Sequence, residues 1–318
     1  MKQNAVIVYV SRTQDLPLLF RSITLLGKNW KFLPKYPIVV FHDDITKVNQ
    51  SKLLMALHES LGFVPNVKFE LLTFQLPEWV SDDPKQYTVP LDQAWMGYRH
   101  MCRFHSGGIY QDPRLAGYDY YMRLDSDSYI YSRIDYDVFE YMADNSKEYA
   151  FMATDDGEVS SVIEGLWDSA KTFMDSNSIA IPNDVLATVK NGVWEGRLFY
   201  TNFEIAKFSF FRGEKYTKFF EHLDKTGNFF YKRWGDAPVH WLAVKILLDP
   251  SRVWAVDNIT YQHNAWIRNL RAVGPQIPAD IMKYVDGDEK NRYSRKERLV
   301  YALKRFAAGG PDFLNWGE

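Results

Sequence analysis

The sequence predicts an α/β fold built around a mostly parallel sheet. Continuous apolar, β-branched runs recur along the chain, and such runs are typical of strands that are buried on both faces. In the first part of the chain, stretches with helical spacing of apolar residues separate these runs, and this alternation is the pattern of βαβ units. The chain has 318 residues, which is more than the roughly 250 to 300 at which a single core stops growing. We therefore expect one large domain.

Composition and charge exclude several classes of protein. Hydrophobic residues make up 46% and aromatic residues 16% of the chain, which excludes a disordered protein. The net charge of −2 provides no global basic field for nucleic acid, so we expect no nucleic-acid partner. No apolar run approaches the ~18 residues that span a bilayer, and we expect no membrane-spanning segment. The single cysteine, Cys102, cannot form an internal disulfide, which fits a reducing, cytoplasmic location.

Strands and helices alternate through the first quarter of the chain. The expected elements, in order, are a strand at 4–10, a helix at 16–26, a strand at 36–41, a helix at 46–61 and a strand at 67–74. In an open α/β sheet, ligands bind beyond the carboxyl ends of the strands. Arg12 follows the first strand at such an end. It is either a phosphate-binding residue or an ordinary surface arginine.

A long helix follows an irregular loop at 77–90. The predicted helix covers residues 92–105, and Ser106, Gly107 and Gly108 end it. Aromatic residues and arginines, including Tyr98 and Arg103, share this helix. They either bracket a nucleotide or form the polar face of an amphipathic helix.

Two acids stand at the end of the next strand. Residues 118–131 read YDYYMRLDSDSYIY, an aromatic, β-branched run that is interrupted by Asp125 and Asp127. Residues two apart in a strand point to one face, and two carboxylates 4 Å apart repel by roughly a kcal/mol in water. Hard oxygen ligands suit Mg²⁺ or Mn²⁺ that carries a phosphate-bearing substrate. A solvated acidic turn is the other interpretation of this pair.

The second half contains further strands and helices. After a variable stretch at 176–197, Glu204 lies inside an apolar strand, where a carboxylate is costly unless it is paired. Asp236 and His240 lie in a turn before a helix, and Asp236 is either functional or a helix cap. The expected helices are 137–145, 167–175, 216–226 and 237–248, with a basic helical stretch at 292–305; the expected strands are 149–154, 202–211, 253–256 and 259–263.

Four motifs resemble one family. They are RHMCRFHSGGIY at 99–110, YDYYMRLDSDSYIY at 118–131, NFEIAKFSFFR at 202–212 and YKRWGDAPVH at 231–240. In the same order, they are similar to the fungal-type Kre2/Mnt1 α-1,2-mannosyltransferases, glycosyltransferase family 15. The resemblance implies a GT-A type fold, with a Rossmann-like mixed sheet flanked by helices. It also implies a retaining transfer of mannose from GDP-mannose to the 2-hydroxyl of a mannoside, with Mn²⁺ (or Mg²⁺) as the metal.

The resemblance also implies roles for individual residues. Asp125 and Asp127 match the first and last positions of the family's acidic motif, although this chain has Asp-Ser-Asp where the family has Glu-Pro-Asp or similar. Tyr98 matches a tyrosine set against the nucleotide, Glu204 a candidate nucleophile and His263 a histidine associated with the metal. The complete expected site comprises the catalytic residues Glu204 and Asp236, the nucleotide-sugar-binding residues Arg12, Tyr98, Arg103, Arg123, Asn202 and His240, and the metal ligands Asp125, Asp127 and His263.

Alternatives remain at the level of the reaction, the Glu204 side chain and the location. The donor is GDP-mannose or another nucleotide sugar, GDP-fucose or a UDP-sugar, and a catalytically silent carbohydrate-binding relative is a further possibility. Glu204 is a nucleophile or a buried acid paired with an arginine such as Arg123. Family members are typically Golgi membrane proteins, so the Golgi lumen is the alternative location if an anchor has been removed. We expect a single GT-A domain with a nucleotide-binding half at about 1–135, an acceptor half at about 136–265 and a helical tail at 266–318.

Overall fold

The computed structural model describes residues 3–89, 95–155, 157–263 and 266–268, and it confirms the predicted α/β class. Contacts divide these residues into two units. The first unit comprises residues 3–5, Thr73–Met122 and Phe139–Val256, and the second comprises Val6–Leu72, Arg123–Val138 and the described residues from Asp257 onward. The expected halves at about 1–135 and 136–265 therefore divide the chain differently, because the second unit takes both an early and a late stretch.

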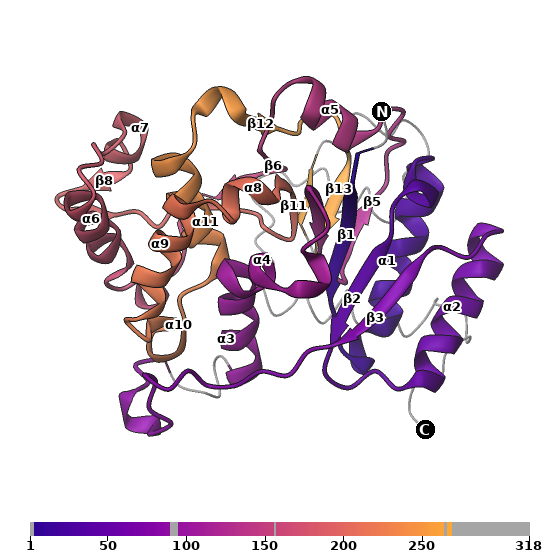
Figure 1. Ribbon diagram of the computed structural model, residues 1–318, viewed down its shortest axis with the longest axis horizontal. Coiled ribbons are helices and arrows are strands. Elements are labelled where there is room, and N and C mark those ends of the chain that lie inside the picture. Colours follow the sequence, from indigo (N-terminus) through magenta and orange to yellow (C-terminus); the bar gives the residue numbers. More distant parts are fainter. Residues whose placement is uncertain (1–2, 90–94, 156, 264–265, 269–318) are drawn as a thin grey trace, which may run out of the picture. The chain divides into compact units, whose positions relative to one another are not determined.

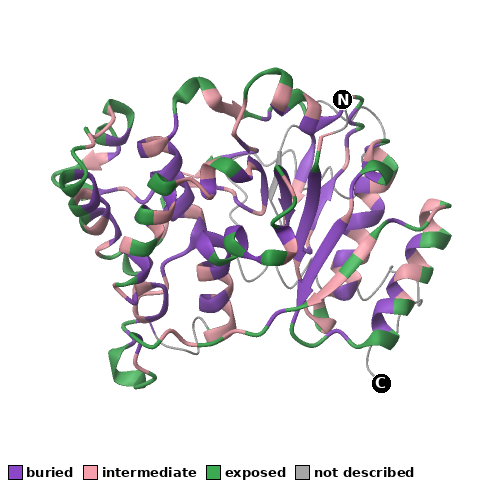
Figure 2. Cartoon of the chain, in the orientation of Figure 1, coloured by how far each residue is buried: buried purple, intermediate pink, exposed green. Residues whose placement is uncertain are grey.

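Parallel strands form the sheet of the second unit. β1 (Ala5–Val10) pairs with β2 (Ile38–His42), which pairs with β3 (Val67–Leu71), and both pairings are parallel, as the alternating pattern predicts. α1 (Leu16–Asn29) and α2 (Lys47–Leu61) connect these strands and lie alongside them in Figure 1. β1 and β2 are buried almost throughout, which explains their continuous apolar sequences (Figure 2).

A mixed arrangement of strands occurs in the first unit. β6 (Tyr149–Phe151) pairs in parallel with β12 (Val253–Ala255) and antiparallel with β11 (Phe203–Lys207). The strand expected at 202–211 is shorter than predicted, because Phe208–Phe211 forms the helical turn α8. Phe208 and Phe211, three residues apart, are both buried, and a helical turn places such residues on one face.

The chain passes from the first unit into the second within β4 (Tyr120–Leu124), whose residues are all buried. The acidic turn follows β4 directly. A small antiparallel sheet of β5 (Ser128–Ile130), β13 (Tyr261–His263) and β14 (Trp266–Arg268) begins just after this turn. The expected helical tail therefore starts with a strand, and the predicted stretch at 292–305 lies outside the described residues.

The helix expected at 92–105 is confirmed in its central part, where α3 covers Met96–Arg103. A π-helical turn, Phe104–Gly108, continues it and leads into the short α4 (Ile109–Gln111). The predicted stop at Ser106 to Gly108 is wrong, since the backbone stays helical there. Gly107 has a packing reason to be glycine, because a Cβ at this position would overlap the ring of Phe220.

The other predicted helices and strands occur in the predicted order, with bounds that shift by a few residues, and the sequence did not predict the short elements at 183–199 and 228–231. The other helices are α5 (Val138–Asp144), α6 (Leu166–Ser176), α7 (Asn183–Leu186), α9 (Glu214–Asp224), α10 (Asn228–Tyr231) and α11 (Asp236–Leu247). The other strands are β7 (Thr154–Asp155), β8 (Val189–Lys190), β9 (Val193–Trp194) and β10 (Leu198–Phe199). Short 3-10 turns cover Thr13–Asp15, Leu33–Lys35, Pro84–Gln86, Pro113–Leu115, Ser160–Val162 and Pro250–Arg252. No helix in the described ranges has the length and apolar character needed to cross a membrane.

Candidate active site

The acidic turn of the second unit is held in a defined shape by serine hydroxyls. The backbone N–H of Asp125 donates to Ser128 Oγ at 3.1 Å, and the N–H of Ser128 donates to the carbonyl of Asp125 at 2.9 Å. Ser126 donates to Ser11, at the end of β1, at 3.0 Å. Ser128 is also 2.7 Å from the hydroxyl of Tyr261 on β13. The turn is therefore tied to the end of β1 and to β13, which fixes where its carboxylates lie.

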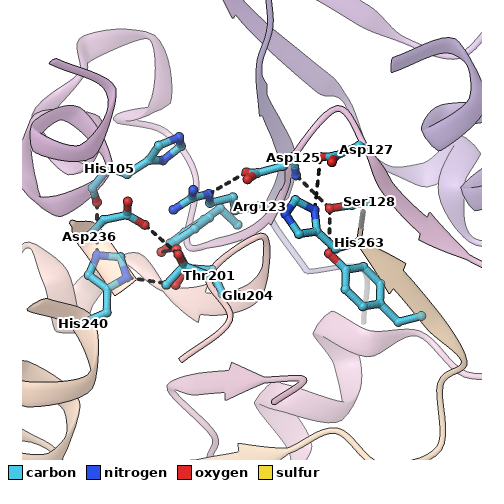
Figure 3. Close-up of polar contacts among 12 residues, drawn as sticks. His105, Arg123, Asp125, Asp127, Ser128, Thr201, Glu204, Asp236, His240 and His263 are labelled. Carbon is cyan, nitrogen blue, oxygen red and sulfur yellow. Dashed lines mark hydrogen bonds and ion pairs between the residues drawn. The ribbon is translucent and has the colours of Figure 1, made fainter. Parts of the chain in front are cut away.

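Each acid of the turn faces a basic side chain (Figure 3). Arg123 Nε donates to Asp125 Oδ1 at 3.2 Å, and His263 Nδ1 lies 3.1 Å from Asp127 Oδ1. The side chains of Asp125 and Asp127 are 32% and 22% exposed, whereas that of Arg123 is 3% exposed. The charge of Arg123, and that of His263 when it is protonated, offset the mutual repulsion of the two carboxylates, which would otherwise destabilise the turn.

His263 reaches the turn through strand pairing. β13 pairs antiparallel with β5, and His263 lies opposite Ser128, the residue next to Asp127. Burial alone would lower the pKa of His263, but the hydrogen bond and charge of Asp127, together with the charge of Asp125, raise it above its usual value. A proton on this imidazole is therefore favoured by the same negative field that favours a bound cation.

The donor set of this turn fits a divalent metal. Two carboxylates and one imidazole are ligands that Mn²⁺ accepts, and the imidazole distinguishes the set from one suited to Mg²⁺ alone. Asp127 and His263 are already together. Among the residues that the structure describes, no three His, Cys, Asp or Glu side chains come close enough together to hold a metal as they stand. The assignment of Asp125, Asp127 and His263 as joint ligands stays a prediction.

Arg12 lies at the carboxyl end of β1, as predicted. Its Nε is 3.5 Å from Asp15, and its side chain is 32% exposed. The next residue, Thr13, donates its N–H to the carboxylate of Asp44 at 2.7 Å, which ties the loop after β1 to the loop after β2. The end of the parallel sheet thus presents a guanidinium from a fixed loop, which suits a phosphate ligand.

Glu204, in the first unit, is buried and accepts three hydrogen bonds (Figure 3 shows its contact with His240). Tyr121 donates to Oε1 at 2.8 Å, Tyr149 donates to Oε2 at 2.9 Å, and His240 Nδ1 lies 3.0 Å from Oε2. Glu204 is thus buried and paired, but the expected arginine is not its partner, and its role stays a prediction. Histidine and tyrosine contact the carboxylate, whereas Arg123 contacts Asp125.

Asp236 begins α11 and is also buried. The cap of this helix is Gly235, so Asp236 does not act as the helix cap. Its Oδ2 accepts a hydrogen bond from the hydroxyl of Thr201 at 2.7 Å. A negative charge in the first turn of a helix interacts favourably with the helix dipole. The carboxylate of Asp236 is therefore stabilised by the helix end and held by the residue that precedes Asn202.

Tyr98 and Asp236 share a neighbour, Cys102. The guanidinium of Arg233 lies 5.2 Å from the centre of the Tyr98 ring. Cys102 interacts with both Tyr98 and Asp236, and burial raises the pKa of its thiol to about 12. The pKa of Tyr98 is raised as well, first by Cys102 and then by burial. Cys102 is thus a free, buried thiol.

Arg103 has a structural partner within the first unit. Its Nε and one terminal nitrogen donate to the two carboxylate oxygens of Asp224, both at 2.7 Å. Trp79 donates its indole N–H to the carbonyl of Asp224 at 2.9 Å. The guanidinium of Arg103 is thus engaged in a bidentate ion pair within the protein. Asn202, expected to bind the nucleotide sugar, lies half-buried in the turn before β11.

The tyrosines around Glu204 and the Thr201 hydroxyl were missed by reasoning from the sequence. Tyr110, Tyr121 and Tyr149 are aromatic residues in apolar runs, and such residues are normally read as core. A buried acid needs donors, and that requirement was the available signal. It does not say which tyrosines provide them.

Comparisons with known proteins agree with the motif resemblance. The family model described as glycolipid 2-alpha-mannosyltransferase matches residues 1–272. The chain is 35% identical over 274 residues to the O-glycoside alpha-1,2-mannosyltransferase omh1 of Schizosaccharomyces pombe, covering 82% of this chain and 69% of that protein. It is 35% identical over 280 residues to the glycolipid 2-alpha-mannosyltransferase 1 of Candida albicans, covering 82% of this chain and 63% of that protein.

Solved structures show the same fold. The mannosyltransferase Ktr4p of Saccharomyces cerevisiae in complex with GDP has a TM-score of 0.75 at 27% identity, covering 88% of this chain and 74% of that one. Core-mannan synthase A (CmsA/Ktr4) of Aspergillus fumigatus, in a Mn/GDP form, has a TM-score of 0.74 at 27% identity, covering 83% of this chain and 76% of that one. The expected GT-A type fold is confirmed.

Proposed function

Because this chain belongs to the glycolipid 2-alpha-mannosyltransferase family, we propose that it is a retaining α-1,2-mannosyltransferase that uses Mn²⁺. It transfers mannose from GDP-mannose to the 2-hydroxyl of a mannoside on a glycan, glycoprotein or glycolipid. The names of the relatives support the sugar and the linkage. The GDP and Mn/GDP forms of the two similar structures support the nucleotide and the metal.

The observation that carries this proposal is the pair Asp127–His263 beside Asp125 at the end of β4. We assign these three residues as the metal ligands. When bound there, Mn²⁺ stabilises the negative charge that develops on the diphosphate leaving group. Arg12 and Arg123 contribute guanidinium groups in the same unit, and Arg12, being partly exposed, is assigned to the phosphate.

Retention requires a carboxylate on the face of the sugar opposite the leaving group. The first unit offers Glu204 and Asp236. Both oxygens of Glu204 already accept hydrogen bonds from buried side chains, and its exposed fraction is 1%. We assign the carboxylate that acts on the sugar to Asp236, next to the Tyr98 that we assign to the nucleotide sugar. Both roles are open to direct test by D236N and Y98F.

A transfer assay tests the proposal directly. GDP-mannose and methyl α-mannoside are incubated with the protein with and without Mn²⁺, and NMR of the disaccharide reports the linkage and the anomeric configuration. We expect an α-1,2 product that requires the metal. D127N should lose this activity, whereas D135N is the matched control because Asp135 is an exposed acid in the same unit. Absence of turnover with every nucleotide sugar would overturn the proposal.

The donor is tested separately by ligand stabilisation. A nucleotide at 100 times its dissociation constant stabilises the folded state by about 2.7 kcal/mol. We expect GDP with Mn²⁺ to raise the unfolding temperature more than UDP does. An equal effect of UDP would favour a UDP-sugar as donor. If mannoside binding persists in D125A while GDP no longer binds and no transfer occurs in the wild type, the protein is a carbohydrate-binding relative instead.

A further inference from the structure

Four side chains of the first unit form a closed ring of hydrogen bonds. Glu204 contacts Tyr121 and His240, as described above. The hydroxyls of Tyr121 and Tyr110 are 3.1 Å apart, and the hydroxyl of Tyr110 is 3.1 Å from His240 Nε2. The exposed fractions of all four residues are 2% or less. These contacts are therefore shielded from bulk water, and each side chain of the ring has hydrogen-bond partners within the ring.

The carboxylate fixes the direction of every donor in the ring. Tyr121 gives its proton to Glu204, so its oxygen accepts from Tyr110. Tyr110 has then used its proton, so its oxygen accepts from His240 Nε2–H. The same nitrogen is 3.1 Å from the backbone carbonyl of His105, which can only accept. Nε2 of His240 is therefore protonated.

The other ring nitrogen is also a donor. Nδ1 of His240 faces Glu204 Oε2 at 3.0 Å, and an unprotonated nitrogen would repel a carboxylate there. Tyr149 donates to the same oxygen. Each carboxylate oxygen of Glu204 thus accepts one hydrogen bond from a tyrosine hydroxyl. Burial raises the pKa of Tyr110 and of Tyr121 well above the usual value, so these hydroxyls keep their protons.

The ring also explains how the start of α11 is held. Asp236 and His240 are four residues apart on this helix and so lie on one face. Thr201 and Glu204 are three residues apart around the start of β11. Thr201 contacts Asp236 and Glu204 contacts His240, so two parallel contacts join the first turn of α11 to β11 and its preceding turn.

We propose that Glu204 and His240 form a buried carboxylate–imidazolium pair that positions Asp236, and that Glu204 does not itself act on the sugar. The role of Asp236 rests on the proposed function, whereas the charge state of the pair does not. As an ion pair, Glu204 carries a charge that is neutralised inside the protein. It is a positioning residue, because it acts through His240 and α11.

NMR of the full chain, labelled with ¹⁵N in its histidine rings, tests the charge state without any substrate. At pH 8 an ordinary histidine is neutral, so we expect a histidine with both ring nitrogens protonated, and this signal should be absent in H240N. Detection of one unprotonated ring nitrogen in His240 at pH 8 would overturn the proposal. This result does not depend on whether the protein transfers mannose.

Kinetics test the positioning role. We expect E204Q and H240N each to lower kcat by about 100-fold, a typical loss for a misplaced catalytic group, with the KM of GDP-mannose within threefold of wild type. The double variant should lose no more than the poorer single variant, since both break one unit. Y216F is the matched control, because Tyr216 is buried nearby but donates to Ser106 outside the ring.

The competing role for Glu204 gives a different pattern. If Glu204 acts on the sugar, E204Q abolishes transfer while H240N retains most of it, and this outcome contradicts the proposal. Circular dichroism and the unfolding temperature of each variant, compared with Y216F, separate a loss of position from a loss of folding. If the wild type transfers no sugar at all, the proposed function fails, while the NMR experiment still decides the charge state of the pair.

Discussion

His100 on α3 predicts that the protein loses stability below neutral pH. Its ring is stacked on Phe74 with centres 5.1 Å apart, and Phe230 packs edge-on at 4.9 Å. Burial, and then the positive charge of Arg103, lower the pKa of His100 to about 4. The folded protein therefore resists protonation of this ring, whereas the unfolded chain protonates it near the ordinary pKa of about 6.5.

The sign and size of the effect follow from linkage. The unfolded state binds the proton first as the pH falls below about 6.5, so unfolding becomes more favourable until the folded-state pKa of about 4 is reached. The full loss is at most about 3.5 kcal/mol, for about 2.5 pKa units at about 1.4 kcal/mol each. Between pH 7 and pH 5 the expected loss is about 2 kcal/mol.

The assay compares the wild type with H100F in urea unfolding at pH 7, 6 and 5. Phenylalanine keeps a flat ring between the two aromatic neighbours but does not titrate. The stability of the wild type relative to H100F should fall by about 2 kcal/mol from pH 7 to pH 5. Taking this difference between the proteins cancels the other titrating groups that they share. H100Q serves as a second non-titrating variant in case the larger ring does not fit.

A pH-independent difference between the two proteins would refute this reasoning. It would mean that His100 takes up its proton in the folded state as easily as in the unfolded chain.

Three further predictions follow from single contacts. D127N should weaken the Mn²⁺-dependent stabilisation by GDP by at least about 1.4 kcal/mol, a tenfold loss of affinity, and a thermal shift equal to that of D135N would contradict the metal assignment. R103A should lower the free energy of unfolding by about 2 kcal/mol, because it leaves the carboxylate of Asp224 buried without its bidentate partner. The thermal shift that GDP induces in R103A should match that of the wild type, and loss of this shift would indicate that Arg103 binds the nucleotide. K218A is the control, because it removes an exposed ion pair, and it should change the free energy of unfolding by less than about 0.5 kcal/mol. T46A should cost about 1 kcal/mol in urea unfolding, because Thr46 caps α2 through Asn49 N–H, whereas T46S should stay near wild type.

Local patterns predicted most of the elements. The apolar runs of β1 and β2 and the spacing of α1 and α2 are signals contained within each segment, and the structure confirms them. The aromatic run at Phe208–Phe211 was read as strand because aromatic residues favour strands. There the burial of two rings on one helical face outweighed that preference.

In the candidate site, too, the sequence shows one part and leaves another part unpredicted. A buried acid such as Glu204 is visible in the sequence, since an acid inside an apolar strand needs a partner. The identity of the partner is not visible. His240 is 36 residues away and Tyr121 is 83 residues away in the chain, and only the packing of α11 and β4 brings them to the carboxylate. Arginine was the natural expectation because it is the usual partner of a buried carboxylate.

The pairing of β5 with β13 shows why the proposed set of metal ligands cannot be derived from spacing alone. Asp125 and Asp127 are two residues apart in the chain, so the sequence pattern at the end of the strand is enough to find them. His263 contacts Asp127 because it lies opposite Ser128 in the strand pairing. A shift of one residue in this register would turn the side chain of His263 to the other face of the small sheet. The hydroxyl of Tyr261 on Ser128 opposes such a shift, because it would lose its 2.7 Å contact. The register, and with it the position of the proposed third ligand, thus depends on a buried tyrosine that we do not assign to the metal.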